Sequence, residues 1–316
     1  MEPSRSISSR TLSMIIPVYF NADSLPLLFV ELRKFEAALS ALGLDLEPIF
    51  VDDGSGDDSL AHLMAFRGER AGTKVIKLSR NFGAPAAVKA GMRFVTGDCF
   101  IFFAADLQEP LDQVVLMAEQ WTRGHKLVLS ARKSRADPMA SRVFAAIYRT
   151  LVRLTIRRDY PSGGVGLALM DKVMLAPMVS SAKNINPNVY AFWLGFSPKI
   201  LEYDRARRAS GRSRWTFQKK FQYVIDTLTG FSVVPIRLMS GLGLITAICS
   251  FAYAVRIVIA SLSGQIDVSG FATIVTVNAF LGGCTLFMLG VIGEYLWRIF
   301  DQVSGRPEAV VAEEHL

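Results

Sequence analysis

The sequence predicts an α/β domain with a mainly parallel sheet and flanking helices, followed by an interfacial amphipathic helix and two C-terminal transmembrane helices. The first observation is that short apolar runs alternate with segments of helical periodicity up to about Pro235. Such alternation is typical of a parallel sheet covered by helices on both faces. The second observation is that two long apolar runs follow, each close to the ~20 residues that a membrane-spanning helix needs.

The elements of the α/β domain are expected in regular alternation. Strands are predicted at residues 12–16, 46–51, 74–78, 100–103 and 127–130. Helices are predicted between them at residues 25–42, 59–70, 85–95 and 111–123. Pro85 suits the first turn of its helix, because the N–H that proline lacks would have no partner there. Parallel strands end at one edge of the sheet, so we expect the segments that follow them to bind a ligand.

Polar side chains follow the second and third predicted strands. Asp52 and Asp53 follow the second strand, where a carboxylate can accept hydrogen bonds from a base N–H or from ribose hydroxyls. A plain turn with a helix cap is the alternative interpretation of this run. Arg80 and Asn81 follow the third strand just before a helix, a position that suits a phosphate. The alternative for Arg80 is an ordinary surface charge.

The fourth and fifth predicted strands end in further candidates. Asp106 and Gln108 follow the fourth strand and offer oxygen ligands two positions apart, the chemistry that Mg²⁺ or Mn²⁺ prefers. Ala104 stands where a second carboxylate would complete the pair. Arg132 follows the fifth strand. The sequence therefore predicts one edge of the sheet that combines carboxylates, an amide and cations.

Composition narrows the class of protein. The formal net charge is +7, with 35 Lys and Arg, which indicates an anionic partner such as a membrane surface or phosphates. The three cysteines are widely spaced, so neither a disulfide framework nor a zinc site is expected. Glycine motifs for dinucleotides, phosphate loops and hydrolase nucleophiles are absent from the sequence. The polar N-terminus leads directly into a strand, so no signal peptide is expected.

The two apolar runs are predicted to form a membrane hairpin. They occupy residues 238–262 and 271–293, and the alternative is a pair of buried helices in a soluble core. The loop between them has Asp267 and no Lys or Arg, whereas Arg237, Arg298 and Arg306 flank the pair. By the positive-inside rule, both ends of the hairpin face the cytoplasm. We therefore expect a multi-pass protein of the cell (inner) membrane with a cytoplasmic catalytic domain.

A basic amphipathic segment precedes the hairpin. Apolar residues recur there at helical spacing, and basic residues cluster at its start: Phe217, Phe221, Val224, Ile225 and Leu228, with Arg212, Arg214, Lys219 and Lys220. This pattern predicts a helix on an anionic membrane face, with a core-facing helix as the alternative. The expected organisation is a cytoplasmic domain at residues 1–210, the interfacial region at 211–235, the hairpin at 236–300 and a cytoplasmic tail at 301–316.

Five motifs in a fixed order carry a resemblance to a known family. They are "IIPVY", "VDDGS", "LSRNFG", "AADLQEP" and "RRASGRSRW", with a final "GEYLWRIFDQV". The chain resembles the family 2 glycosyltransferases of the GT-A fold. Within that family it is most similar to the polyprenyl-phosphate glycosyltransferase group, which includes bactoprenol glucosyltransferase and dolichol-phosphate mannose synthase.

The resemblance implies a role for each candidate residue. Pro17, Tyr19 and Asp53 would bind the nucleotide base and ribose, with Asp52 beside them. Asp106 and Gln108 would meet a divalent metal and the diphosphate. Arg132 would approach the acceptor phosphate. A basic loop would close over the phosphates, and its members are Arg205, Arg208, Ser213 and Arg214. The alternative for this loop is a membrane-surface patch.

The resemblance also implies the reaction and its partners. A sugar would be transferred with inversion from a nucleotide sugar to a polyprenyl phosphate such as undecaprenyl phosphate, giving a lipid-linked sugar for cell-envelope glycans. Asp106, Arg132 and Arg208 would be the catalytic residues, and the protein would form homo-oligomers. No nucleic acid is expected as a partner, because such a binder would explain the charge but not the spans.

Several positions depart from the family pattern. Ala104 replaces the usual first Asp, Phe20-Asn21 replaces Asn-Glu, Gly166 lies near the place of an Asp, and Lys183 replaces a Glu. These departures motivate an alternative function, a catalytically degenerate glycosyltransferase-like protein that acts as a membrane binding or scaffold protein. A processive polysaccharide synthase is a third alternative, but Gly211 stands where its Gln is needed.

Overall fold

The computed structural model describes residues 10–132, 146, 148–154, 156–161, 164–183, 185–203, 224–225, 227, 229–263 and 270–316. Its elements in chain order are β1 (Arg10–Val18), α1 (Leu25–Ser40), β2 (Leu44–Asp52), α2 (Ser59–Glu69), β3 (Lys74–Leu78), α3 (Ala84–Met92), β4 (Cys99–Phe102), α4 (Leu111–Thr122), β5 (Leu127–Arg132), β6 (Val165–Asp171), η1 (Lys172–Met174), α6 (Leu175–Val179), α7 (Pro187–Trp193), β7 (Pro198–Tyr203), α9 (Val234–Leu262), α10 (Phe271–Val303) and β8 (Val311–His315).

The alternation predicted for the first part of the chain is confirmed. Every strand and helix expected from β1 to β5 is present, with small shifts at its ends. The strands join in an eight-stranded sheet of order β7-β5-β6-β4-β1-β2-β3-β8. β1 pairs in parallel with both β2 and β4, and β2 pairs in parallel with β3. The mainly parallel sheet expected from the sequence is therefore observed.

The order of the strands shows at which edge of the sheet a ligand is expected to bind. From β1 the chain builds outward through β2 and β3, and it then returns to place β4 on the other side of β1. The order reverses between β1 and β4, and such switch points in parallel sheets are where ligands bind. β6 runs antiparallel to both β4 and β5, so β5 ends at the same edge as β4. The segments that follow β1 to β5 thus lie along one edge.

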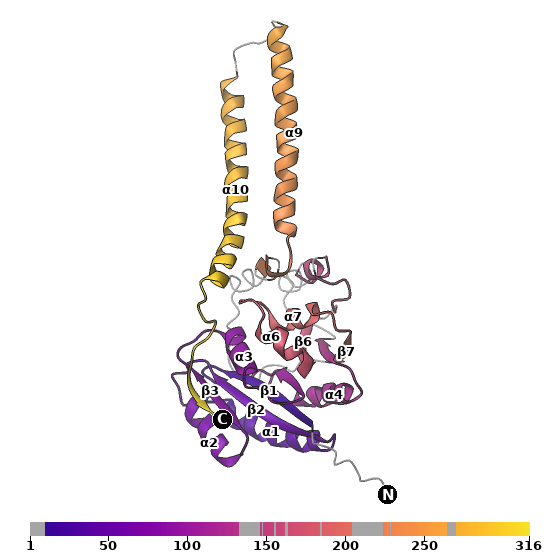
Figure 1. Cartoon of the computed structure of the whole chain (residues 1–316), viewed down its shortest axis with the longest axis vertical. Helices are drawn as coiled ribbons and strands as arrows, with labels where there is room; N and C mark the ends of the chain where they lie inside the picture. Colours follow the sequence, from indigo (N-terminus) through magenta and orange to yellow (C-terminus); the bar gives the residue numbers. More distant parts are fainter. Residues whose placement is uncertain are drawn as a thin grey trace. The chain divides into compact units, whose positions relative to one another are not determined.

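Helices cover both faces of the sheet (Figure 1). Buried residues of α1, α2 and α4 pack against one face, and buried residues of α3, α6 and α7 pack against the other. Successive strand residues point to opposite faces, so Met14 and Ile16 lie in one core while Ile15 lies in the other. This two-sided burial explains why the central strands are continuous apolar runs.

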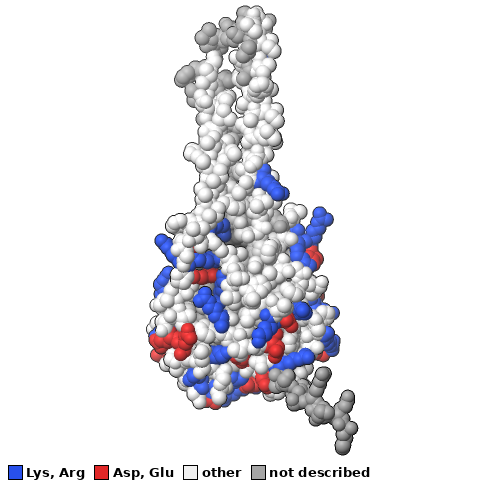
Figure 2. Space-filling model, viewed as in Figure 1, with Lys and Arg blue, Asp and Glu red and all other residues white. Residues whose placement is uncertain are grey.

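The chain divides into two compact units. Unit 1 contains residues 1–222 and 307–316, and unit 2 contains residues 223–306. Unit 2 holds α9 and α10, which include stretches long and apolar enough to cross a membrane, Val234–Ile257 and Phe280–Val303, with mean hydropathies of 1.8 and 1.4. The most apolar window of each stretch is 0% buried, whereas a core helix of a soluble protein would be buried. Figure 2 shows Lys, Arg, Asp and Glu spread over unit 1, while the hairpin carries few.

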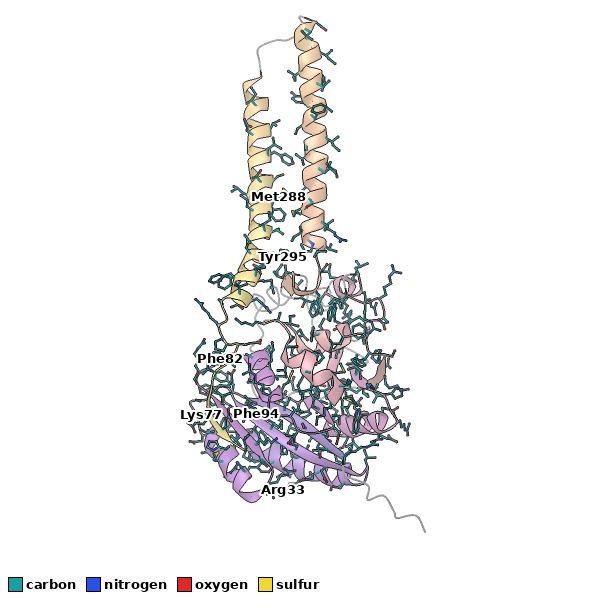
Figure 3. The ribbon with its side chains drawn as sticks, viewed as in Figure 1. Arg33, Lys77, Phe82, Phe94, Met288 and Tyr295 are labelled. Atoms are coloured by element: carbon teal, nitrogen blue, oxygen red, sulfur yellow. The ribbon has the colours of Figure 1, made fainter. Side chains whose placement is uncertain are left out.

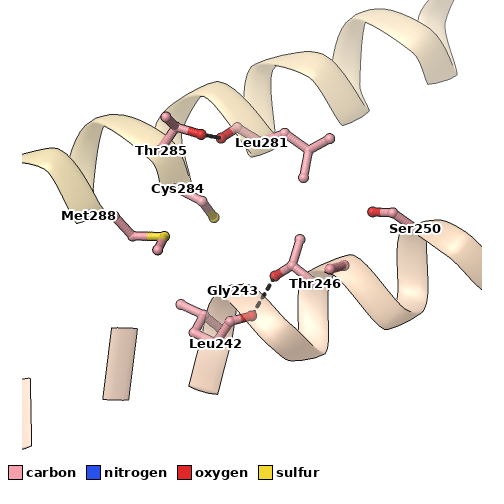
Figure 4. A pocket seen from close by; sticks show the side chains of 9 residues that line it. Leu242, Gly243, Thr246, Ser250, Leu281, Cys284, Thr285 and Met288 are labelled. Carbon is pink, nitrogen blue, oxygen red and sulfur yellow. Dashed lines mark hydrogen bonds between the residues drawn. The ribbon is translucent and has the colours of Figure 1, made fainter. Parts of the chain in front are cut away.

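A small, partly open pocket lies between the two helices of unit 2 (Figure 4). It has a volume of about 240 Å³ and is lined by small and apolar residues, including Gly243, Cys284 and Met288. The hydroxyls of Thr246 and Thr285 donate to carbonyls of their own helices, at 2.8 and 2.9 Å. Their polar groups are thus satisfied inside each helix, as an apolar environment requires.

Candidate functional site

The loop after β1 is held against the turn after β2. Three backbone N–H groups of the loop donate to side chains of the turn: Phe20 to Ser55 Oγ (3.1 Å), Asn21 to Ser59 Oγ (2.9 Å) and Ala22 to Asp57 Oδ2 (3.2 Å). These bonds use three residues of the Ser- and Asp-rich run that follows Asp53. Through these hydrogen bonds the run fixes the loop that carries Tyr19 and Phe20, which we call the clamped loop.

Asp53 joins the turn after β2 to the loop after β3. Its two carboxylate oxygens accept from the N–H groups of Phe82 (2.7 Å) and Gly83 (2.9 Å). The side chain is only 2% exposed. Burial raises the pKa of Asp53, although the two backbone hydrogen bonds oppose this rise. In the structure, both oxygens of the residue expected to bind the nucleotide hold a loop in place, and direct contact with a nucleotide stays a prediction.

Gly54 allows the same two segments to approach closely. Its φ is +69°, and a Cβ placed on it would lie 2.7 Å from the carbonyl carbon of Arg80. Only glycine meets both conditions without strain. Arg80 itself is exposed, and its guanidinium carbon lies 4.1 Å from the centre of the Phe82 ring. The loops after β1, β2 and β3 thus form one connected rim.

Asp52 is the buried group of the rim whose hydrogen bonds are incomplete. It is 0% exposed, and its Oδ1 accepts a long bond from the Ser55 N–H at 3.3 Å. Its Oδ2 has no hydrogen-bond partner among the described residues. Burial raises the pKa of Asp52, and the hydrogen bonds from Ser55 offset only part of this rise. A buried carboxylate oxygen in this state is stabilised by any N–H or O–H that reaches it.

Two strained residues lie in the loops that follow β1 and β4. Phe20 (φ 53°) and Leu107 (φ 51°) are the non-glycine residues with positive φ in the described part of the chain. This region costs energy for large side chains, and such strain concentrates at functional sites. The two residues follow the strands on either side of the point where strand order reverses. Backbone strain and the polar residues therefore both indicate a functional site at this edge of the sheet.

Asp106 and Gln108 lie on either side of the strained Leu107. The Gln108 N–H donates to Asp106 Oδ1 at 3.3 Å. Asp106 is half-buried, Gln108 is 6% exposed, and Ala104 is exposed. Within the described residues, no three His, Cys, Asp or Glu side chains are grouped as a metal site. One carboxylate and one amide nevertheless fit Mg²⁺ or Mn²⁺, since such ions complete their shell with phosphate oxygens and water.

The remaining predicted site residues are placed only in part. Pro17 lies within β1 beside Val51, and Tyr19 and Asn21 follow in the clamped loop, where the Tyr19 N–H donates to Asn21 Oδ1 at 2.9 Å. Asn81 is exposed in the loop after β3. Arg132 ends β5 at the same edge of the sheet. The predicted basic loop lies outside the described residues: Arg205, Arg208, Ser213 and Arg214. Most of the predicted interfacial helix does as well.

Tyr203 is a residue near this edge that the sequence did not single out. It ends β7, which pairs in parallel with β5, and it is 5% exposed. A Cβ on Gly166 would lie 2.4 Å from the Tyr203 hydroxyl oxygen and 3.0 Å from Ser130 Oγ. The space beside Gly166 is therefore filled by two hydroxyls, which leave no room for a carboxylate. No local signal could have identified Tyr203, because its position depends on a strand that the apolar pattern did not predict.

Comparisons with known proteins identify the family of this chain. The model of Glycosyl transferase family 2 matches residues 13–175, from β1 to the start of α6. The uncharacterized glycosyltransferase sll0501 of Synechocystis is 32% identical over 96% of this chain and 95% of its own length. The SfII prophage-derived bactoprenol glucosyl transferase of Shigella flexneri is 27% identical over 96% of this chain and 98% of its own length.

Among solved structures, the chain is similar to glucosyl-3-phosphoglycerate synthase from Mycobacterium tuberculosis, with a TM-score of 0.49 and 18% identity over 70% of this chain and 80% of that one. The family match and the relative at 32% identity confirm the resemblance predicted from the five motifs. The chain is a glycosyltransferase and belongs to glycosyl transferase family 2.

Proposed function

We propose that this glycosyltransferase transfers a sugar, with inversion, from a nucleotide-sugar donor to a membrane polyprenyl phosphate. The observation that carries the proposal is the length of the match to bactoprenol glucosyl transferases. In the Shigella relative it covers 98% of that protein and 96% of this chain, so it includes α9 and α10 as well as the α/β unit. A hairpin able to enter a membrane suits an acceptor that is itself a lipid.

The rim around Asp52 is the proposed place for the nucleoside. Asp52 Oδ2 is buried without a described partner, and a base N–H or a ribose hydroxyl would supply the missing donor. Tyr19 and Phe20 lie on the clamped loop beside it, with ring centres 4.7 Å apart. Arg80 and Asn81 border the start of α3, where backbone N–H groups favour an anion. These groups support binding of a nucleotide rather than of a neutral ligand.

Asp106 is proposed to act at the diphosphate. Together with Gln108 it would hold a divalent ion, which supplies positive charge where the leaving nucleoside diphosphate develops negative charge. The attacking group needs no strong base, because a phosphate monoester with a second pKa of about 6 is largely dianionic at neutral pH. One protein carboxylate is then sufficient, and the exposed Ala104 does not prevent the reaction.

The path of the chain supports a cytoplasmic catalytic unit. β8 follows α10 and pairs with β3 in unit 1, so the chain leaves unit 1, passes through both helices and returns to it. If both helices cross a membrane, the two ends of the hairpin lie on the same side. The distribution of Arg237, Arg298 and Arg306 favours the cytoplasmic side. Homo-oligomerisation stays a prediction.

A donor screen tests the proposal. Membranes containing the protein are incubated with labelled nucleotide sugars and polyprenyl phosphate, with and without a chelator, and the lipid extract is counted. We expect label in the lipid from one donor, less label with the chelator and none with Asp106→Ala. Ala104→Asp is the matched variant, and we expect it to change the metal concentration required. Absence of labelled lipid with every common donor, or full activity of Asp106→Ala, would contradict the proposal.

A second candidate function is binding of a nucleotide without transfer. The hydroxyls of Tyr203 and Ser130 occupy the space beside Gly166, and this observation favours the candidate because a carboxylate of the family pattern has no room there. Such a protein would bind a nucleotide but would form no labelled lipid. Its biological role would also survive Asp106→Ala, which distinguishes it from the enzyme.

A further inference from the structure

The last ten residues of the chain form a segment that we call the C-terminal strap (residues 307–316). They belong to unit 1, although unit 2 separates them from the rest of it in sequence. Within the strap, β8 pairs antiparallel with β3, with Val75 opposite His315 and Lys77 opposite Glu313. The Lys77 ammonium lies 2.5 Å from the Glu313 carboxylate, and Figure 3 labels Lys77. The strap is therefore an edge strand of the sheet that carries the candidate site.

The strap continues beyond the end of β3 to the loop of the nucleotide rim. The Ser79 N–H donates to the Val310 carbonyl at 2.9 Å. Ser79 begins the loop whose Phe82 and Gly83 N–H groups bind Asp53. Ala309, next to Val310, is 8% exposed and belongs to the core beneath α3. The strap thus fixes the first residue of the loop after β3, whose last residues bind Asp53 within the rim.

The strap also holds the helix on the other side of that loop. Glu308 Oε2 lies 2.9 Å from Lys89 Nζ of α3, and the two side chains are 16% and 14% exposed. Lys89 also donates to the Ser181 carbonyl, in the segment after α6. An ion pair this far from solvent is screened less than a surface pair. The strap therefore contacts both sides of the loop at residues 79–83. Val310 accepts a hydrogen bond from the first residue of the loop, and Glu308 pairs with Lys89 on α3, the helix that follows the loop.

We propose that the C-terminal strap positions the nucleotide-binding rim, and that Glu308 is its principal positioning residue. Protection of an exposed sheet edge would need only the pairing of β8 with β3. The bonds to Ser79 and Lys89 lie outside that pairing and act on the loop and the helix that hold Asp53. The inference rests on the proposed function, because it assigns this rim to the donor.

The test compares two Glu→Gln variants of the full-length protein. Glu308→Gln removes the charge that faces Lys89. Glu314→Gln is the matched control, since Glu314 lies on the same strap, is exposed and has no ion pair among the described residues. We expect Glu308→Gln to raise the KM for the donor about tenfold, with kcat and the KM for the lipid acceptor within about twofold of wild type. Glu314→Gln should match wild type, and Glu308→Asp should restore most of the affinity.

Amide hydrogen exchange gives a readout that does not depend on transfer. The Phe82 and Gly83 amides, bound to Asp53, should exchange faster in Glu308→Gln than in the control. An unchanged donor KM with unchanged exchange overturns the proposal. An equal change in the donor and acceptor KM, or equal effects of the two Gln variants, also overturns it by indicating a general loss of structure. Faster exchange in a protein that transfers no sugar from any donor would refute the proposed function and leave the hold on the loop intact.

Discussion

Strand β2 carries two buried carboxylates, and their surroundings are opposite. Near its start, Glu47 is 8% exposed and accepts from Lys74 Nζ (2.6 Å) and the Thr96 N–H (3.1 Å), as well as from the hydroxyls of Ser13 and Thr96. At its end, Asp52 is 0% exposed, its Oδ1 accepts a long bond from the Ser55 N–H, and its Oδ2 has no partner among the described residues. One strand therefore holds a carboxylate with a full set of hydrogen bonds, Glu47, and a carboxylate with an incomplete set, Asp52.

The pKa values of the two groups shift in opposite directions. Burial by itself would raise the pKa of Glu47, but hydrogen bonds from Lys74, Ser13 and Thr96 outweigh it and the pKa is lowered. Burial also acts on Asp52, where the bonds from Ser55 are too weak to offset it, and the pKa is raised. Buried polar groups with all their hydrogen bonds stabilise a fold, whereas buried polar groups that lack hydrogen bonds are typical of binding sites. The comparison supports a structural role for Glu47 and the proposal that Asp52 serves the binding site.

The largest effect is expected from Glu47→Gln. The change removes the negative charge 2.6 Å from the Lys74 ammonium, which keeps its hydrogen bond to the Phe94 carbonyl (2.7 Å), and breaking such a shielded ion pair costs about 3 kcal/mol. We expect the thermal unfolding temperature of the full-length protein to fall, with the donor KM of the folded fraction unchanged. Asp45→Asn, an exposed position on the same strand, is the control. An unfolding temperature equal to that of the control would break the comparison.

The next effect is expected from Asp52→Asn, with the opposite pattern. Loss of a charged hydrogen-bond acceptor should weaken donor binding by about 2 kcal/mol, which is about thirtyfold. Thermal stability should rise, because a buried charge with incomplete hydrogen bonds is removed. Donor affinity and unfolding temperature are measured on the same preparation. If the variant is less stable but binds the donor normally, the prediction is wrong, and Asp52 stabilises the fold as Glu47 does.

The pH dependence of stability sharpens the same contrast. Because the folded pKa of Glu47 lies below its ordinary value of 4.5, its contribution is present above pH 4.5 and is lost as the pH falls through the folded pKa. Because the folded pKa of Asp52 lies above 3.8, its ionisation destabilises the fold as the pH rises above that value. The stability gap between wild type and Glu47→Gln should therefore shrink in acid. The gain from Asp52→Asn should disappear in acid as well, and a pH-independent gap in either case would contradict the assignment.

The smallest effect is expected at the strained Phe20. Its side chain is 46% exposed and its φ is 53°, a region that Asn tolerates better than Phe. Phe20→Asn should stabilise the protein by about 1 kcal/mol, measured by thermal unfolding, and should weaken donor binding if the strain serves the site. Leu27→Asn, at an exposed apolar position of α1, should not stabilise. Equal responses at the two positions would show that backbone strain is not the cause.

Several features of the fold were predictable because they depend on local pattern. The strands from β1 to β5 are apolar runs, and the helices between them have helical periodicity. β8 was not predicted, because its sequence Val311–His315 contains two glutamates and no apolar alternation. It forms a strand only because the edge of β3 offers unpaired backbone groups and Lys77 lies opposite Glu313. β6 and β7 were not predicted either; β7 has the mixed sequence PKILEY, whereas β6, VGLALMD, is an apolar run that local pattern could have identified.

By itself, the sequence determined the alternation of strands and helices, the two apolar helices and the residue types that follow each strand. These properties follow from hydrophobic periodicity and composition, which are local. Only the tertiary structure decided that Asp53 is bound by two loop amides, while an oxygen of its neighbour Asp52 has no hydrogen-bond partner among the described residues. Two adjacent residues of one type are indistinguishable until the loop after β3 approaches and bonds one of them, because hydrogen-bond partners are chosen by packing.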